Sequence, residues 1–528
     1  MLEWRVTVGT PDGSEAQMGR VPFSNGPIHI VCTLPEGTLT RAVATVPLQL
    51  ADGEKIFMNG YQTWTNCPEY TGRSRIRGLR GVPKAVVNRF GFDRYGDYHF
   101  VKYPNRSGIT HGFSWCYFRL GARFRLIASL DEKPGYTMFR YDSRKGVLTI
   151  ERDCAGVDCS GKFHAFALFL AEGSEEEVFD RWFAAMKLPA PTAQPLRGYS
   201  SWYNRYEDIT EQTIRADLSG CEKLLSKGDL FQIDDGWEPA VGDWLEPDET
   251  KFPGGLQPLA EQIHDAGFLA GLWLAPFVCR KGSALMEAHP DWLLRVNGEP
   301  WSCGSNWGGF YSLDIDNPEV MDYLRRVFHR VLHEWGFDLV KLDFLYGAAP
   351  FGTNQESRAG RMIRAMDFLR EVCGEKLILG CGVPVMPAFG RVDYCRVSCD
   401  VSLDWDDKWF MRLFHRERVS TKQAIENTIF RRQLNGRAYL SDPDVFFLRE
   451  DNLRLSEEQK LLLARVNALL GGVLLTSDDP SAYTDRQREV YRELLHLRDA
   501  RQIRVDADAG RIEYTLDAKV QSILLPRR

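Results

Sequence analysis

The first part of the chain consists of short apolar runs separated by turn residues. Such runs occupy, for example, residues 28–34, 41–50, 124–130 and 146–152, with Gly, Pro, Asp and Asn between them. Several short strands at this spacing are typical of an antiparallel β-sandwich. Residues 174–187 begin with acidic residues and then carry apolar residues at helical spacing, which predicts a helix at the end of this domain.

After the proline-rich segment 188–195 the pattern changes, and short apolar runs alternate with amphipathic stretches. The runs that we expect to form strands are 197–203, 230–237, 269–277, 338–344, 377–383, 395–400, 437–444 and 473–479. Helical periodicity lies between them at 208–227, 256–266, 318–335, 357–373, 420–434 and 456–470. Eight βα units in succession predict a (β/α)8 TIM barrel. The long connection between the third and fourth strands predicts an excursion over the barrel mouth.

These patterns predict an α/β protein with the following domain order. An N-terminal β-sandwich domain covers residues 1–187, a linker covers 188–195, the barrel covers 196–500, and a small C-terminal β element covers 501–528. A last helix is expected at 484–498, before the C-terminal element.

Composition narrows the classes of function. The chain has 528 residues, of which 44% are hydrophobic and 26% charged, and its net charge is −6, which argues against binding to nucleic acid or to an anionic membrane. No apolar run has the length of a signal peptide or a membrane span, so we expect a cytoplasmic protein. The 12 cysteines are scattered, as expected for free thiols in a reducing compartment.

Cofactor and metal motifs are also missing from the sequence. Cys154 and Cys159 lack a second Cys or His pair nearby, and the paired glycines lack the strand-to-helix context of a phosphate-binding loop. We therefore expect no cofactor and no metal. Aromatic residues make up 12% of the chain and include 14 Trp, which fits either core packing or flat sugar-binding surfaces. The oligomeric state stays open.

Aspartates close five of the eight predicted strands. They are Asp234, Asp235, Asp343, Asp400, Asp442, Asp444, Asp478 and Asp479. The carboxyl ends of barrel strands meet on one face, and gathering anions there is costly, so the cluster indicates an active site. For a single Asp the alternative is a helix cap or a turn, and this alternative is favoured for the last four.

Two of these aspartates have a cation nearby on the same strand. Lys341 precedes Asp343 by two residues and Arg396 precedes Asp400 by four, so each pair lies on one strand face. Each cation could hold its carboxylate near the mouth, or form a buried ion pair inside the barrel. Two carboxylates facing each other across a cavity suit glycosidic cleavage, although the sequence cannot give their separation.

Nine motifs occur in the order found in a known family. They are SWYNRY, QIDDGWE, LAGLWLAPF, HPDWLL, VKLDFLYGA, ILGCGVPVMPAFG, CRVSCD, LSDPD and SDD, and NGYQTWT (59–65) precedes them. Together they resemble the melibiase-like α-galactosidases of glycoside hydrolase family 36, in particular the short bacterial type. The resemblance implies a retaining α-galactosidase that acts on α-galactosides without a cofactor.

The resemblance also implies roles by position. Asp343 matches the nucleophile, Asp400 matches the acid/base, and Asp234 with Asp235 matches the pair that holds the galactose 4- and 6-hydroxyls. The other substrate-binding positions that it implies are Trp64, Tyr203, Trp273, Lys341, Cys381 and Arg396. For the aromatics the alternatives are core or domain-interface packing, and for Cys381 a buried inert thiol.

One departure from the family concerns Ser398. The family often has glycine there, near the sugar 2-position, so this serine leaves the preference at C2 open. An α-N-acetylgalactosaminidase and a transglycosidase resembling raffinose synthases are therefore alternatives on the same fold. The small pocket at C2 disfavours the first, and the compact length of the chain disfavours the second. A catalytically dead carbohydrate-binding protein is disfavoured because both Asp343 and Asp400 are present.

Overall fold

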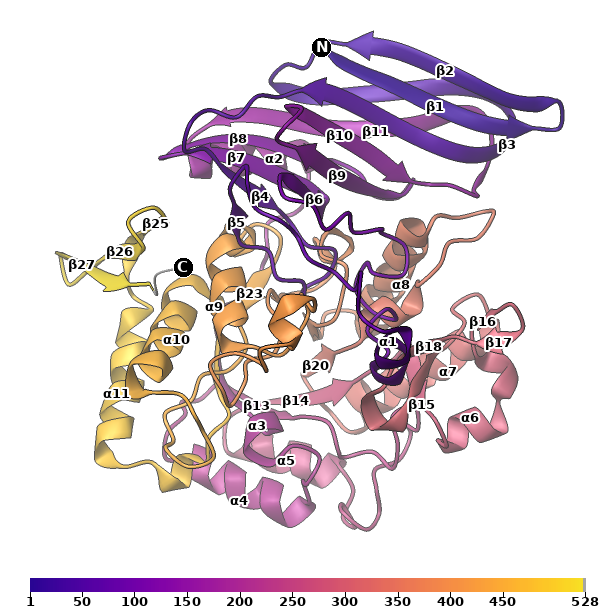
Figure 1. The fold of residues 1–528 in the computed structure, drawn as a ribbon. Coiled ribbons are helices and arrows are strands. Elements are labelled where there is room, and N and C mark those ends of the chain that lie inside the picture. Colours follow the sequence, from indigo (N-terminus) through magenta and orange to yellow (C-terminus); the bar gives the residue numbers. More distant parts are fainter. Residues whose placement is uncertain (526–528) are drawn as a thin grey trace.

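The structure, a computed structural model, describes residues 1–525. An antiparallel β domain lies on one side of a parallel β/α barrel, and a small three-stranded sheet flanks the barrel (Figure 1). The predicted fold class is confirmed. The boundaries of the predicted domains stay a prediction, and residues 526–528 of the predicted C-terminal element lie outside the described residues.

The N-terminal strands are joined by hydrogen bonds into one continuous antiparallel sheet. They are β1 (Leu2–Thr10), β2 (Gly13–Val21), β3 (Gly26–Pro47), β4 (Lys55–Met58), β5 (Glu69–Tyr70), β6 (Ile109–Phe113), β7 (Trp115–Leu120), β8 (Arg123–Ser129), β9 (Tyr136–Asp142), β10 (Val147–Asp153) and β11 (Asp158–Gly173). Strand β3 pairs with β11 along its first half and with β1 and β10 along its second half. Because these long strands are shared, the sheet folds back on itself as a sandwich.

The alternation of buried and exposed positions along β3 explains this folding. Every second residue in its first half is buried, so one face of the strand is apolar. Side chains from β7 and β8, such as Phe118 and Ile127, meet Tyr141 and Ile150 from β9 and β10 in one core. Helix α2 (Glu175–Met186) follows, capped by Ser174, and buries Trp182 among the aromatics at the barrel side of the domain.

The barrel strands run parallel and are almost wholly buried. They are β12 (Leu196–Ser200), β13 (Leu230–Ile233), β14 (Leu269–Leu274), β20 (Leu339–Leu342), β21 (Leu377–Gly380), β22 (Tyr394–Arg396), β23 (Leu440–Asp442) and β24 (Val473–Thr476). The ring closes between β24 and β23, where the amide of Gly472 donates to the carbonyl of Ser441 (2.8 Å). Each predicted strand is present, but most end earlier than the aspartates that follow them.

Helices cover the outside of the barrel. They are α4 (Glu211–Cys221), α5 (Gln257–Asp265), α7 (Pro318–His329), α8 (Arg358–Cys373), α9 (Thr421–Phe430), α10 (Glu457–Leu470) and α11 (Asp485–Leu497), whereas the short helix α3 (Trp202–Arg205) directly follows β12 at the mouth of the barrel. Side-chain caps set several of their starts: Thr210, Ser456 and Thr484 each form a capping box. Helix α4 is shorter than the predicted 208–227 at both ends, because it begins after the Thr210 cap and ends at Cys221.

The predicted excursion between the third and fourth barrel strands is present. It holds β15 (Val278–Arg280), α6 (Ala284–Ala288), β16 (Arg295–Val296), β17 (Glu299–Pro300), β18 (Ser302–Gly304) and β19 (Phe310–Ser312). Helix α1 (Lys84–Phe90) of the N-terminal domain lies beside it (Figure 1), and the hydroxyl of Ser305 donates to the carbonyl of Phe90 (3.0 Å). The N-terminal domain thus reaches the barrel mouth.

Arg431, at the end of α9, joins the two domains. Its side chain is fully buried. The guanidinium donates to Asn59 Oδ1 (3.0 Å) and to the carbonyls of Thr63 (2.5 Å) and Gln62 (3.0 Å) in the N-terminal domain. It also donates to the carbonyl of Val397 in the barrel (2.9 Å). One buried cation therefore fixes the loop 59–65 to the barrel.

The C-terminal element forms a small antiparallel sheet of β25 (Arg501–Asp506), β26 (Arg511–Leu516) and β27 (Lys519–Leu524). The cysteines of the chain are free thiols. Within residues 1–525, no helix is both long enough and apolar enough to span a bilayer.

Candidate active site

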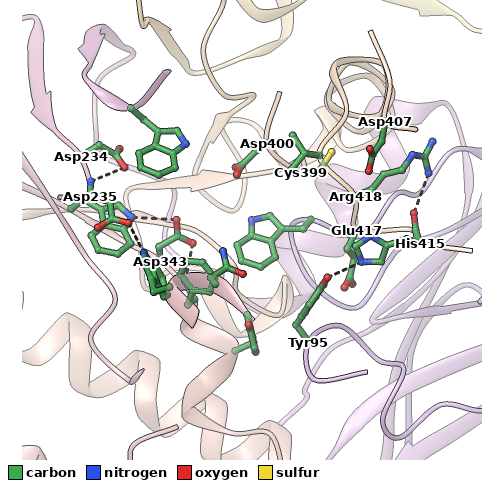
Figure 2. Close-up of a pocket in the computed structure, with 18 of the residues that line it drawn as sticks. Tyr95, Asp234, Asp235, Asp343, Cys399, Asp400, Asp407, His415, Glu417 and Arg418 are labelled. Atoms are coloured by element: carbon green, nitrogen blue, oxygen red, sulfur yellow. Dashed lines mark hydrogen bonds between the residues drawn. The ribbon is translucent and has the colours of Figure 1, made fainter. Parts of the chain in front are cut away.

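A cavity of about 400 Å³ opens at the carboxyl ends of the barrel strands. Residues that follow β13, β14, β20 and β22 line it, and Trp64 and Tyr95 reach it from the N-terminal domain. Of the predicted site residues, those that line the cavity are Trp64, Asp234, Asp235, Trp273, Lys341, Asp343 and Asp400. Figure 2 shows Asp234, Asp235 and Asp343 at one end of it, with Asp400 facing them.

Asp343 is held in place by donors on both carboxylate oxygens. Its Oδ1 accepts from the amide of Phe344 (2.8 Å), and its Oδ2 accepts from Trp273 Nε1 (3.3 Å). Phe344 adopts a left-handed backbone with φ of 52°. That conformation is strained for an aromatic residue, and such strain is typical of functional sites.

Asp400 is bound by a buried arginine. Arg396 Nη1 lies 2.7 Å from Asp400 Oδ1, and the same guanidinium pairs with Asp442 (3.1 Å) and Asp444 (3.0 Å). The predicted Arg396–Asp400 pair is therefore present, although the strand ends at Arg396. Burial raises the pKa of Asp400, the Arg396 guanidinium opposes this rise, and the nearby Asp343 adds to it.

Lys341 pairs with Asp234 instead of the predicted Asp343. Its Nζ lies 2.9 Å from Asp234 Oδ2, which also accepts from Gln232 Nε2 (2.6 Å). The reason is that Asp343 lies beyond the end of β20, where Phe344 and Trp273 occupy its oxygens. Burial alone would lower the pKa of Lys341, but the Asp234 carboxylate raises it above its usual value.

Asp235 shares its surroundings with a second carboxyl group. Burial raises the pKa of Asp235 to about 6, partly offset by a hydrogen bond with Glu238. Trp307 Nε1 donates to Asp235 Oδ2 (3.0 Å). Gly236, with φ of 111°, lets the chain leave β13 so that both Asp234 and Asp235 line the cavity.

Trp64 enters the cavity from the loop that Arg431 anchors. Its Nε1 lies 3.4 Å from the Sγ of Cys381. Gly382 leaves room for the indole, because a Cβ at this position would lie 2.8 Å from Trp64 Cζ2. Cys381 is fully buried, and it supports Trp64 from behind the cavity wall.

Other predicted residues lie behind the wall. The Tyr203 hydroxyl donates to Asp444 Oδ2 (2.6 Å), which places this ring next to the Arg396 network. The Ser398 hydroxyl is buried and donates to the carbonyl of Cys399 (2.8 Å). In the structure Cys399 lines the cavity at this position, and Ser398 faces away from it.

The remaining strand-end aspartates have structural partners. Asp478 accepts from the amide of Leu448 (2.6 Å) and the hydroxyl of Tyr483 (2.8 Å), and Asp479 caps the turn at Pro480–Ala482. Asp442 and Asp444 form ion pairs with Arg396. The sequence had favoured a turn or a helix cap for these two aspartates and did not predict this pairing.

Sequence reasoning missed a substantial part of the cavity wall. The missed lining residues are Phe92, Tyr95, Trp202, Glu207, Asn306, Trp307, Phe344, Tyr346, Cys399, Asp407, Met411, His415, Glu417, Arg418 and Val419. Trp202 directly precedes the chosen Tyr203, and Phe344 follows Asp343, so their motifs carried a signal. Tyr346 and Cys399 also stand in quoted motifs, VKLDFLYGA and CRVSCD. The rest lie on connections without strand or helix periodicity. Within residues 1–525, no three His, Cys, Asp or Glu side chains form a group that could hold a metal ion.

The chain matches known proteins along the barrel. The Melibiase family model matches residues 194–365. An α-galactosidase from Escherichia coli is 31% identical over 182 residues, which are 32% of this chain and 24% of that protein. The match therefore spans about a quarter of that relative.

A solved structure matches nearly the whole chain. It is an α-galactosidase from Thermus thermophilus in complex with p-nitrophenyl α-D-galactopyranoside, with 28% identity and a TM-score of 0.75. The alignment covers 94% of this chain and 98% of that one. The predicted resemblance to family 36 α-galactosidases is confirmed.

A second solved structure, of much lower identity, shares the fold. The α-galactosidase AgaA from Geobacillus stearothermophilus is 13% identical, with a TM-score of 0.62, and the match covers 99% of this chain and 81% of that one. The arrangement of a β domain on a barrel therefore persists where most of the sequence differs.

Proposed function

We propose that this protein is a retaining α-galactosidase that releases terminal α-linked galactose from oligosaccharides or glycosides. The observation that carries the proposal is the pair of carboxyl groups in one cavity, Asp343 fixed by two donors and Asp400 held by Arg396. The Thermus relative, which binds a nitrophenyl α-galactoside, supports the same substrate class.

The two carboxyl groups would act in two steps. An oxygen of Asp343 forms a bond to the anomeric carbon while the bond to the leaving oxygen breaks, and the proton of Asp400 passes to that oxygen. Water then attacks the anomeric carbon, its proton passes to Asp400, and the bond to Asp343 breaks. The raised pKa of Asp400 favours its protonated form, which a general acid needs in the first step.

The Asp234–Asp235 end of the cavity is the proposed binding site for the galactose unit. Asp234 is fixed by Lys341 and Gln232, and Asp235 by Trp307, so neither carboxylate is free to turn away. A carboxylate fixed at the axial 4-hydroxyl would lose its partner if glucose were bound. Sites built in this way can reject the wrong analogue by about 10⁴–10⁵-fold.

The test is a comparison of 4-nitrophenyl glycosides: the α-galactoside, β-galactoside, α-glucoside and α-N-acetylgalactosaminide. We expect fast hydrolysis of the α-galactoside alone. Proton NMR of the first-formed sugar should show α-galactose, as a double displacement requires. Comparable hydrolysis of the glucoside, or release of β-galactose first, would contradict the proposal.

Two of the alternatives are outcomes of this test. Hydrolysis of the N-acetylgalactosaminide would favour that activity, and transfer of galactose to added sugars in place of water would favour a transglycosidase. The inactive-protein alternative is excluded by any turnover that Asp343→Gly abolishes. Cytoplasmic location stays a prediction.

A further inference from the structure

The motif QIDDGWE ends with Glu238, an acidic residue to which the proposed reaction gives no role. Its side chain is 6% exposed and lies outside the cavity wall, whereas Asp235, three residues earlier, lines the cavity and is 4% exposed. A buried carboxyl group costs free energy unless it has a hydrogen-bond partner. The partner of Glu238 therefore indicates what this residue does.

The two aspartates of this motif are held in different ways. Lys341 Nζ lies 2.9 Å from Asp234 Oδ2, so a buried cation balances the charge of Asp234. Within residues 1–525, no lysine, arginine or histidine forms an ion pair with Asp235 or with Glu238. Asp235 instead accepts from Trp307 Nε1 (3.0 Å) and shares a second hydrogen bond with the carboxyl group of Glu238.

A hydrogen bond between two carboxyl groups requires a proton, because an ionised carboxylate can only accept. Two buried carboxylates in contact would also repel each other, so the pair carries one proton and one negative charge. Burial and the charge of Asp235 raise the pKa of Glu238 well above its ordinary value, whereas burial raises the pKa of Asp235 to about 6. The proton therefore belongs to Glu238, and the negative charge belongs to Asp235 at the cavity wall.

The other charged groups nearby favour the same arrangement. Glu207 lines the cavity, and its negative charge adds to the rise in the pKa of Asp235. The Nζ of Lys251 donates to the backbone carbonyls of Glu207 (2.9 Å) and Gly236 (3.0 Å) instead of to a carboxylate. A second anion at Glu238 would therefore have no cation paired with it.

The turn that follows β13 fixes Glu238 in place. The amide of Gly236 donates to Glu238 Oε2 (3.4 Å), and the amide of Asp248 donates to the carbonyl of Trp237 (2.8 Å). A Cβ on Gly236 would lie 2.7 Å from the carbonyl oxygen of Glu207, so the turn packs closely against the neighbouring backbone. The backbone thus holds this carboxyl group beside the adjoining aspartate.

We propose that Glu238 is a positioning residue: as a neutral carboxylic acid it donates a hydrogen bond to Asp235 and fixes that carboxylate for the hydroxyls of galactose. The proposal rests on the proposed α-galactosidase activity and adds a residue that acts on the substrate only through Asp235. A neutral donor holds a carboxylate without cancelling its charge, so Asp235 keeps its full strength as an acceptor for the sugar.

The test replaces Glu238 by two side chains of similar length. Glu238→Gln keeps a neutral donor, and its kcat/KM on 4-nitrophenyl α-galactoside should stay within about 3-fold of the wild type. Glu238→Met lacks the donor and should lower kcat/KM at least about 10-fold, as expected when a hydrogen bond to a charged group is lost. The inhibition constant of free galactose should rise by a similar factor, since the loss is in binding of the galactose unit.

A double substitution separates positioning from structural support. If Glu238 acts through Asp235, adding Glu238→Met to Asp235→Asn should lower kcat/KM less than about 2-fold, because the carboxylate to be positioned is already absent. Glu249→Ala changes an exposed residue of the same connection and should leave both constants unchanged. Urea unfolding checks that each variant is folded, and Glu238→Ala takes the place of Glu238→Met if the latter unfolds.

Each contrary outcome overturns the proposal. Equal losses in Glu238→Gln and Glu238→Met would mean that a neutral donor is not what the site needs. Full activity in Glu238→Met would mean that Asp235 keeps its place without this partner. Equal losses from Glu238→Met with and without Asp235→Asn would make Glu238 a structural residue. In all three cases the α-galactosidase function stands, since it is judged by the wild type on the panel of 4-nitrophenyl glycosides.

Discussion

Replacing Gly382 with Ala should displace Trp64 and reduce activity strongly. An added Cβ would lie 2.8 Å from Trp64 Cζ2 and 3.0 Å from the amide nitrogen of Phe344. Ordinary contact begins at 3.4 Å, so the indole must retreat by roughly 0.6 Å or the backbone next to Asp343 must move. Either shift disturbs the wall around the reacting carbon.

The expected magnitude has two parts. Gly382 has φ of 56°, a left-handed conformation that costs Ala about 1 kcal/mol, and overpacking adds about 1–3 kcal/mol to the loss of stability. A misplacement approaching 1 Å in a catalytic site costs about 100-fold in rate. We therefore expect kcat/KM on 4-nitrophenyl α-galactoside to fall by up to about 100-fold.

Gly436→Ala is the matched control. Gly436 also has positive φ, at 75°, but nothing lies within 4 Å of its added Cβ. This variant should lose only the conformational part, about 1 kcal/mol, and keep its activity. The assay is kcat/KM together with the urea midpoint of unfolding for both variants. Equal stability losses with activity retained in both would refute the reasoning that Gly382 positions Trp64.

Two further predictions concern Asp400 and Arg431. Asp400→Ala should lose far more activity on an α-galactosyl disaccharide than on the nitrophenyl substrate, because a general acid matters most for a poor leaving group; equal losses would argue against that role. Since Asp400 acts protonated and its pKa is raised, wild-type kcat/KM should fall as pH rises through that pKa, and this limb should be absent from the pH profile of Asp400→Ala. Arg431→Met should leave buried carbonyls unpaired and destabilise the protein by about 3–5 kcal/mol, seen as a lower urea midpoint for loss of activity. An unchanged midpoint would mean that the loop 59–65 holds its place without this residue.

Periodicity predicted the barrel and the β domain because both depend on repeated burial of one face. Every expected barrel strand formed. Runs such as 269–277 and 377–383 are strongly apolar, and the strands that they contain are almost wholly buried in the barrel. The helix starts were predictable where a cap precedes an apolar stretch, as at Ser456. The ends of strands were less predictable, because the final residues of each motif turn away from the sheet to line the cavity.

The inner end of the cavity could be predicted because its residues stand in motifs at strand ends. The partner of Lys341 could not, because it depends on which carboxylate at the end of another strand reaches this lysine, and Asp234 follows β13, more than a hundred residues earlier. The outer wall was missed for a related reason. Tyr95, His415 and Glu417 lie on irregular connections, and the packing of the two domains brings Tyr95 next to the other two.

The division of the cavity between two domains has a consequence for how such a protein can diversify. The proposed catalytic carboxylates lie at the strand ends of the barrel. Tyr95 and the connection 401–419 lie outside those strands, so they can exchange residues without touching Asp343. Selection, or a mutagenesis library, could therefore change which sugars are accepted while the carboxylates at the strand ends stay the same. Under the proposed function, the barrel carries out the reaction, and the loops around its mouth determine which substrates are accepted.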